Sequence, residues 1–336
     1  MYLTYMSAPH PTHALSGSFV QMATPEILRD PLSILDSSPL DYSPSSQSLD
    51  DAGGALANLL DAVRQRDDTL HRLSQLENEV DVLRRRDRAL SHHMARLDEE
   101  QRLAARLQQD FLPKTLPIVG KLKFQTLFKP ASYVSGDLYD VARLDEHHVG
   151  LYIADAVGHG MPAALLTMFM KNALVTKEIG KGWYRLLEPI ETISRLNDSL
   201  REQNLAASTF ATAVYARIDS RTLQATIASG GHPAPVILSR EGTLREIPGE
   251  GPLLGIFDDE IFTQQTVQLE PGDRLFLHSD GLELTFQTQG DAHIDAERWK
   301  SELVSRAQLP TADILRDISA ANPGTDDLTV LVVEVG

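Results

Sequence analysis

The hydrophobic pattern of the chain changes character near residue 112. Residues 55–111 contain neither proline nor glycine, and apolar side chains recur there at heptad spacing. One seam position holds Leu73, Val80, Asp87, Met94 and Gln101, and the other holds Leu76, Leu83, Leu90, Leu97 and Ala104. The spacing predicts a long helix over 55–112 that ends where Pro113 breaks the hydrogen-bond ladder. We expect a parallel dimeric coiled coil, with a helix folded back on its own domain as the alternative.

Beyond a short connector, the pattern becomes one of brief apolar or alternating runs, which is typical of strands. Strands are expected at 124–128, 149–154, 210–218, 223–228, 234–238, 274–278 and 328–335, and helices at 161–179, 188–204, 295–307 and 311–320. Runs of strands with helices grouped between them predict an α+β β-sandwich flanked by helices over 118–336. Residues 1–54 are rich in serine and proline without a sustained period, so we expect them to be disordered.

Composition narrows the class of protein. The chain has 336 residues, 42% of them hydrophobic, no cysteine and a formal net charge of −16. The acidic surface argues against nucleic acid as a partner. No apolar run is long enough to cross a membrane, so we expect a cytoplasmic protein with no membrane insertion. Without cysteine, any metal must be held by oxygen or imidazole ligands.

Four acidic residues stand at places where strands and turns meet. Asp155 follows the apolar run 149–154, Asp280 follows the run 274–278, and Asp326 precedes the last expected strand. Asp137 comes directly after Gly136. Each could be an ordinary turn acid. If the strand ends converge, however, the carboxylates would repel one another unless cations lay between them. An all-oxygen set suits two Mn²⁺ or Mg²⁺ ions, which can activate water for hydrolysis of a phosphate ester.

Six motifs in a fixed order give the chain a family resemblance. They are Gly-Asp-x-Tyr-Asp at 136–140, Asp-x-x-Gly-His-Gly-x-x-Ala-Ala-Leu-Leu at 155–166, Gly-His-Pro-x-Pro at 231–235, a Pro-Leu-Gly-like stretch at 251–255, a stretch ending in Ser-Asp-Gly at 271–281, and Asp-Asp-x-Thr at 326–329. Together they resemble the SpoIIE/RsbU branch of the metal-dependent PPM serine/threonine phosphatases. The likeness covers about residues 104–336 and includes a helix that ends in Leu-Pro.

The resemblance implies a role for each acid. Asp155 would bridge two metal ions, and the main-chain carbonyl of Ala156 would bind the second. Asp280 and Asp326 would hold the first ion, and Asp137 would bind or orient the second. A water activated by the two ions would then attack phosphoserine or phosphothreonine.

Other polar residues near these motifs have simpler interpretations. We expect His159 to have a structural role in the turn, with a role as general acid as the alternative, and His232 to be structural. Ser135 and Ser279 have no basic partner at a readable spacing, so neither is expected to be a nucleophile. The chain departs from the usual pattern at Ser135, where glycine is common, and in the stretch that follows Asp155. None of these departures removes a ligand.

The expected function is therefore that of a protein serine/threonine phosphatase regulated through a dimeric helical linker. Its expected substrate is a phosphorylated regulatory protein, by resemblance a STAS-domain anti-sigma-factor antagonist. The alternative is a catalytically silent phosphoprotein-binding scaffold on a coiled coil. A nucleotide-binding kinase-like domain is disfavoured, because no glycine-rich phosphate-binding motif follows a strand.

Overall fold

The computed structural model describes residues 46–203, 209–258, 260–286 and 298–336. The chain divides into two units, residues 1–83 and 84–336. Of the segment 1–54, expected to be disordered, residues 1–45 lie outside the described residues, and residues 46–54 are helical.

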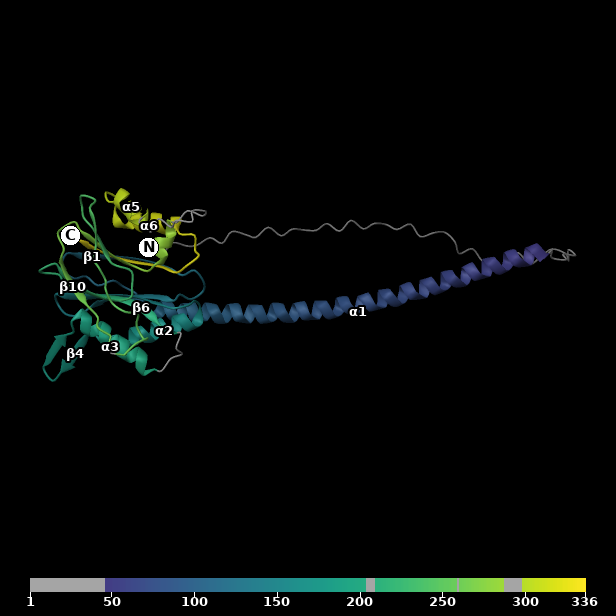
Figure 1. The fold of residues 1–336 in the computed structure, drawn as a ribbon, viewed down its shortest axis with the longest axis horizontal. Helices are drawn as coiled ribbons and strands as arrows, with labels where there is room; N and C mark the ends of the chain where they lie inside the picture. The colour runs from purple at the N-terminus through teal and green to yellow at the C-terminus, as the bar shows by residue number, and fades with distance from the viewer. Residues whose placement is uncertain (1–45, 204–208, 259, 287–297) are drawn as a thin grey trace. The chain divides into compact units, whose positions relative to one another are not determined.

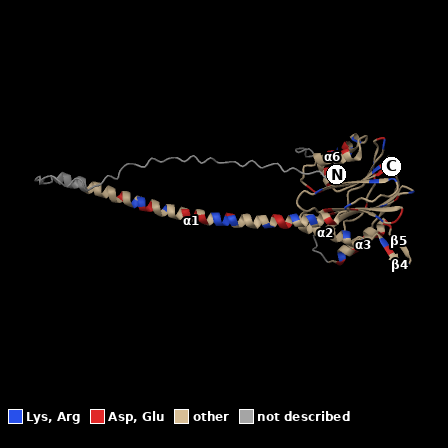
Figure 2. Ribbon diagram, turned by 180° about the vertical axis from the view of Figure 1, so that it is seen from behind, with Lys and Arg blue, Asp and Glu red and all other residues tan. Residues whose placement is uncertain are grey.

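Helix α1 spans Ser46–Phe111 and ends immediately before Leu112 and Pro113, as the proline predicts. Its start lies upstream of the boundary expected at residue 55, and Gly53 and Gly54 are part of the helix. The side chains of Leu90, Met94 and Leu97 are exposed. Charges of both signs alternate along the helix, including the pair between Arg102 and Asp98 at 3.0 Å (Figure 2).

Two five-stranded antiparallel sheets form the body of the second unit (Figure 1). The first sheet has the order β1-β12-β11-β8-β9, with β1 at Leu122–Lys129, β12 at Leu328–Val335, β11 at Arg274–His278, β8 at Val236–Leu238 and β9 at Leu244–Glu246. The second sheet has the order β10-β7-β6-β3-β2, with β10 at Gln264–Gln268, β7 at Gln224–Gly230, β6 at Ala211–Asp219, β3 at His148–Ala156 and β2 at Asp137–Arg143.

Helices cover the outer faces of both sheets, which completes the expected α+β sandwich. Helices α2 (Met161–Ala173) and α3 (Pro189–Glu202) pack on the second sheet. Helices α4 (Gly281–Thr285), α5 (Arg298–Ser305) and α6 (Thr311–Ala321) pack on the first sheet. Alternate residues of each strand point into the core between the sheets, as Leu151 and Ile153 of β3 do.

The connection between α2 and α3 differs from the expected continuous helix over 161–179. Helix α2 ends at Ala173, and the chain then forms a hairpin of β4 (Lys177–Gly180) and β5 (Trp183–Leu186). The β-branched pair Val175 and Thr176 and the turn glycine Gly182, at φ 79°, favour this hairpin over helix. Strands β2, β9 and β10 and the short helix α4 were also not expected.

None of the helices in the described parts of the chain has the length and apolar character needed to cross a lipid bilayer.

Candidate metal-dependent active site

Asp137 and Asp155 lie side by side at one end of the second sheet. They are directly paired across the antiparallel strands β2 and β3. The alternation along these strands sends Tyr139 and Ile153 into the core between the sheets. Asp137 and Asp155 share that parity, so both carboxylates face the opposing sheet at the edge of the core.

Asp280 and Asp326 reach the same end from the first sheet. The residue after β11, Ser279, donates its N–H to the carbonyl of Thr329 at 3.0 Å, and its hydroxyl accepts the N–H of Thr329 at 3.0 Å. This pairing fixes the exit of β11 beside the entry of β12, and the two acids follow and precede these strands. The hydroxyl of Thr329 also donates to Asp137 at 2.7 Å, which joins the two sheets at this point.

The four carboxylates repel one another. Burial raises the pKa of Asp155 to about 7, and the charges of Asp280, Asp326 and Asp327 add to the effect. Burial and then the charge of Asp326 raise the pKa of Asp280. Burial and the charge of Asp155 raise the pKa of Asp137 well above its usual range, although hydroxyl hydrogen bonds offset part of that rise. The charges of these acids thus act on one another at this end of the sandwich.

The donor set fits a hard divalent cation, because all of its members are oxygen ligands. The main chain at Gly136 also lies close to the carbonyl group of Ala156, the expected main-chain ligand. A Cβ on Gly136 would lie 3.1 Å from that carbonyl oxygen. Within the described residues, no three acidic or histidine side chains are already gathered as a cation site. The acids thus share one end of the sandwich without enclosing a common point.

Asp327 has a role that sequence reasoning missed. Its carboxylate accepts the N–H of Ala131 at 2.7 Å and the N–H of Gly136 at 2.6 Å. It therefore ties the loop before Asp137 to the entry of β12, beside Asp326. The doubled acid in the Asp-Asp-x-Thr motif was the available signal, because a residue next to an expected ligand can hold the surrounding backbone.

Gln108 was also missed. Its side chain is buried at the end of α1, where its amide pairs with the main chain of Ser135. Lys171 of α2 donates to the carbonyl of Phe111 and lies 3.3 Å from Asp140. Heptad spacing carries no sign of such contacts, since they depend on which loop meets the helix. They connect the end of α1 to the loop before β2 and, through Lys171, to β2 itself.

The remaining candidate residues agree with non-nucleophilic roles. The hydroxyl of Ser135 accepts the N–H of Asp137 at 3.0 Å, and the hydroxyl of Ser279 holds Thr329. His232 is buried, with Nδ1 2.8 Å from the hydroxyl of Thr212, as expected for a structural histidine. His159 is exposed at the turn after Asp155, so the structural role expected for it stays a prediction.

Comparison with solved structures identifies the class of fold. The SiaA-PP2C domain of Pseudomonas aeruginosa superposes with a TM-score of 0.61 at 22% identity, covering 72% of this chain and 98% of that domain. The RsbU and RsbW domains of Rv1364c from Mycobacterium tuberculosis superpose with a TM-score of 0.56 at 20% identity, covering 67% of this chain and 62% of that one. The second unit therefore has the fold of PP2C-type phosphatase domains.

Sequence comparison then gives the family. The family model of Stage II sporulation protein E (SpoIIE) matches residues 145–336, which is more than half of the chain. The chain therefore belongs to the SpoIIE family, in the SpoIIE/RsbU branch of the PPM-type phosphatases, as the motifs predicted.

Two curated relatives match this chain over about half of its length. Phosphoserine phosphatase RsbU of Bacillus subtilis (strain 168) is 33% identical over 188 residues, which cover 55% of this chain and 54% of RsbU. Phosphoserine phosphatase RsbP of the same organism is 30% identical over 187 residues, which cover 54% of this chain and 45% of RsbP. The chain thus spans about half the length of these relatives.

Proposed function

We propose that this chain is a protein serine/threonine phosphatase that depends on two Mn²⁺ or Mg²⁺ ions. The observation that carries the proposal is that Asp137 and Asp155, paired across β2 and β3, share one end of the sandwich with Asp280 and Asp326. Burial, and after it the charges of neighbouring acids, raise the pKa values of Asp137, Asp155 and Asp280. Such mutual repulsion is relieved by cations. The relatives RsbU and RsbP are both named phosphoserine phosphatases, which supports phosphate-ester hydrolysis as the activity.

The proposed roles are those that the family resemblance implies. Asp155 would bridge the two ions; its pairing with Asp137 and the effect of the Asp280 and Asp326 charges on its pKa support this. Asp280 and Asp326 would hold the first ion, and Asp137 and the carbonyl of Ala156 the second. When bound, the ions supply Lewis-acid activation of water and screening of the phosphate charge. Thr329 keeps Asp137 oriented by its hydrogen bond.

The first experiment is hydrolysis of p-nitrophenyl phosphate by the full chain with Mn²⁺, Mg²⁺ or EDTA. Turnover should require the metal and should fall at least about 100-fold in Asp155→Asn and in Asp280→Asn. Asp313→Asn serves as the matched control, because Asp313 pairs with Arg316 on α6 and has no part in the site. Metal-independent turnover, or full activity in Asp155→Asn, would refute the two-ion proposal.

The alternative function, a phosphoprotein-binding scaffold, makes a different prediction. The scaffold would bind a phosphorylated partner without hydrolysing it and would not need metal. Calorimetry of the full chain with Mn²⁺ separates the two functions, because the phosphatase needs Mn²⁺ binding that Asp155→Asn weakens. No heat of Mn²⁺ binding, together with no turnover of a phosphoserine peptide, would favour the scaffold.

We propose a phosphorylated regulatory protein of STAS type as the substrate, by analogy with the resembling family. The experiment is to incubate the full chain and Mn²⁺ with a serine-phosphorylated STAS protein and with a phosphotyrosine peptide, and to follow both by mass spectrometry. Loss of phosphate from the STAS protein alone is the expected result. Equal hydrolysis of both substrates would argue against serine/threonine specificity.

We also propose that α1 pairs with a second copy of the chain as a parallel coiled coil over residues 55–112. The exposed leucines Leu90 and Leu97, seven residues apart, support this. Sedimentation of the full chain should give a dimer, and Leu90→Asp should shift it toward monomer. Arg88→Asp is the control, because Arg88 follows the seam residue Asp87 and occupies neither of the two seam positions. A monomeric wild-type chain at micromolar concentration would overturn the proposal.

A further inference from the structure

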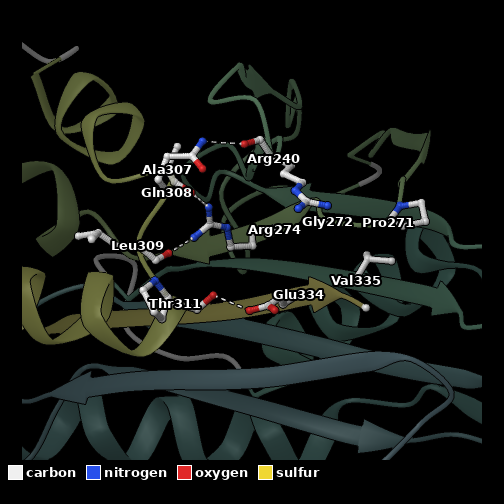
Figure 3. Close-up of a pocket in the computed structure, with 12 residues that line it drawn as sticks. Arg240, Pro271, Gly272, Arg274, Ala307, Gln308, Leu309, Thr311, Glu334 and Val335 are labelled. Carbon is white, nitrogen blue, oxygen red and sulfur yellow. Dashed lines mark hydrogen bonds between the residues drawn. The ribbon is translucent and has the colours of Figure 1, made fainter.

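A cavity of about 530 Å³ opens at the end of the sandwich where β11 begins and β12 ends (Figure 3). Its lining includes Arg240, Gly272, Arg274, Leu309, Thr311 and Glu334. The volume is within the range of small-molecule sites. None of the residues assigned to the metal site lines it.

Arg274 is the distinctive part of this lining. Its side chain is buried, and its guanidinium donates from Nη1 to the carbonyl of Leu309 at 2.9 Å and from Nη2 to the carbonyl of Ala307 (Figure 3). These bonds occupy two of the five guanidinium N–H groups. Glu334 lies directly opposite Arg274 on β12, and its charge favours the charged guanidinium, although the two side chains form no close ion pair. The guanidinium N–H groups that the two carbonyls leave over can still donate to an anion.

The other charged side chains of the lining determine which chemical groups a ligand of this cavity must carry. Arg240 lies at the exposed rim beside Gly272, where a Cβ would meet its side chain at 3.2 Å, and it has no carboxylate partner among the described residues. Glu334 accepts a hydrogen bond from the hydroxyl of Thr311 at 2.8 Å through Oε2, so Oε1 can accept from a ligand hydroxyl. The lining side chains thus carry two guanidinium groups and one carboxylate.

We propose that this cavity is a second binding site, for a small organic phosphate that also carries hydroxyl groups. The planar fork of each guanidinium matches a phosphate group and can bind it through two hydrogen bonds. A phosphate monoester brings nearly two negative charges at neutral pH, and the net charge of +1 on Arg240, Arg274 and Glu334 attracts it. Its hydroxyls face Glu334 and the main chain near Thr311.

The site is separate from the metal centre. Arg274 and Asp280 lie six residues apart at opposite ends of β11, which corresponds to about 20 Å along an extended strand. Glu334 and Asp326 lie in the same way at opposite ends of β12. A phosphate bound in this cavity is therefore not a substrate at the acidic end.

The test is calorimetric titration of the full chain with ribose 5-phosphate in EDTA, which prevents binding through metal ions. Ribose is the matched probe without phosphate. The expected result is saturable binding of ribose 5-phosphate, weakened about tenfold in Arg240→Gln and in Arg274→Lys. Arg245→Gln is the control, since Arg245 is an exposed arginine of β9 outside the cavity lining, and should bind as the wild type does.

Three results would overturn the proposal. They are the absence of saturable ribose 5-phosphate binding up to about 20 mM, equal binding of ribose, and wild-type affinity in Arg240→Gln. Because Arg240 is at the exposed rim, this variant should fold and decides the matter even if circular dichroism shows that Arg274→Lys does not fold.

Discussion

The side-chain amide of Gln108 pairs with both main-chain groups of Ser135. Its Nε2 donates to the carbonyl of Ser135 at 2.6 Å, and its Oε1 accepts the N–H of Ser135 at 2.9 Å. Ser135 is followed by Gly136 and by Asp137, the acid assigned to the second ion. A buried side chain of α1 therefore holds the loop that leads into the proposed metal site, and any displacement of this part of α1 would act on that loop.

Gln108→Ala should weaken Mn²⁺ binding. The change removes two buried hydrogen bonds worth about 0.5–1.5 kcal/mol each; with about half of this free energy expressed in metal binding, we expect Mn²⁺ affinity to fall about two- to tenfold. Calorimetry with Mn²⁺ and the metal dependence of p-nitrophenyl phosphate turnover measure the change. Gln109→Ala is the matched control, because the neighbouring side chain is exposed. Equal Mn²⁺ affinity in both variants would show that the pairing does not position Asp137.

Asp155→Asn should stabilise the metal-free protein at high pH. The pKa of Asp155 is about 7 in the folded chain, against an ordinary value of 3.8. A carboxyl whose pKa rises on folding lowers stability as pH increases between these two values, by up to about 4 kcal/mol above pH 7. In EDTA, the variant should therefore melt above the wild type at about pH 8, with the difference shrinking toward pH 4. A variant less stable than the wild type at pH 8 would contradict this account of the repulsion.

Much of the architecture follows from local pattern. The apolar runs before Asp155 and Asp280 are buried strands in the structure, because their side chains pack in the cores on either side of their sheets. The end of α1 follows from Pro113, whose ring is incompatible with a continuing helix. The four acids could be chosen from sequence because each is attached to a strand end or to a glycine turn.

The missed elements are those whose stability comes from tertiary contacts. Strand β2 carries Asp137 and Asp140 and has weak strand propensity, yet it pairs along its whole length with the buried strand β3. Strand β10 is short and mostly exposed, and only its pairing with β7 defines it. Gln108 and Asp327 were missed for the same reason, since their partners are distant in the chain.

Gly281→Ala should damage the proposed metal site through the backbone. A Cβ at this position would lie 2.0 Å from the carbonyl oxygen of Asp327, so the exit of β11 or the entry of β12 must move. Because Asp280 and Asp326 flank this contact, we expect Mn²⁺ affinity to fall more than about tenfold and stability to fall by about 1–3 kcal/mol. Gly54→Ala, where a Cβ meets nothing within 4 Å, is the control for the substitution itself. Wild-type Mn²⁺ binding in Gly281→Ala would show that this packing does not set the positions of the two acids.

His232→Asn should make the protein less sensitive to acid. Burial, aided by the charge of His278, lowers the pKa of His232 to about 3, from its ordinary value of 6.5. The folded state therefore keeps this ring neutral, while the unfolded chain takes up a proton as pH falls below 6.5. That difference costs the wild type about 2 kcal/mol at pH 5, and a side chain that does not titrate avoids the cost. Asparagine can still hydrogen-bond Thr212.

Urea unfolding in EDTA at pH 7 and at pH 5 measures this difference. The loss of unfolding free energy between the two pH values should be about 2 kcal/mol smaller in His232→Asn than in the wild type. The control is His71→Asn, at an exposed position of α1, which should lose as much stability as the wild type. Equal losses in the wild type and both variants would show that His232 does not carry this pH dependence.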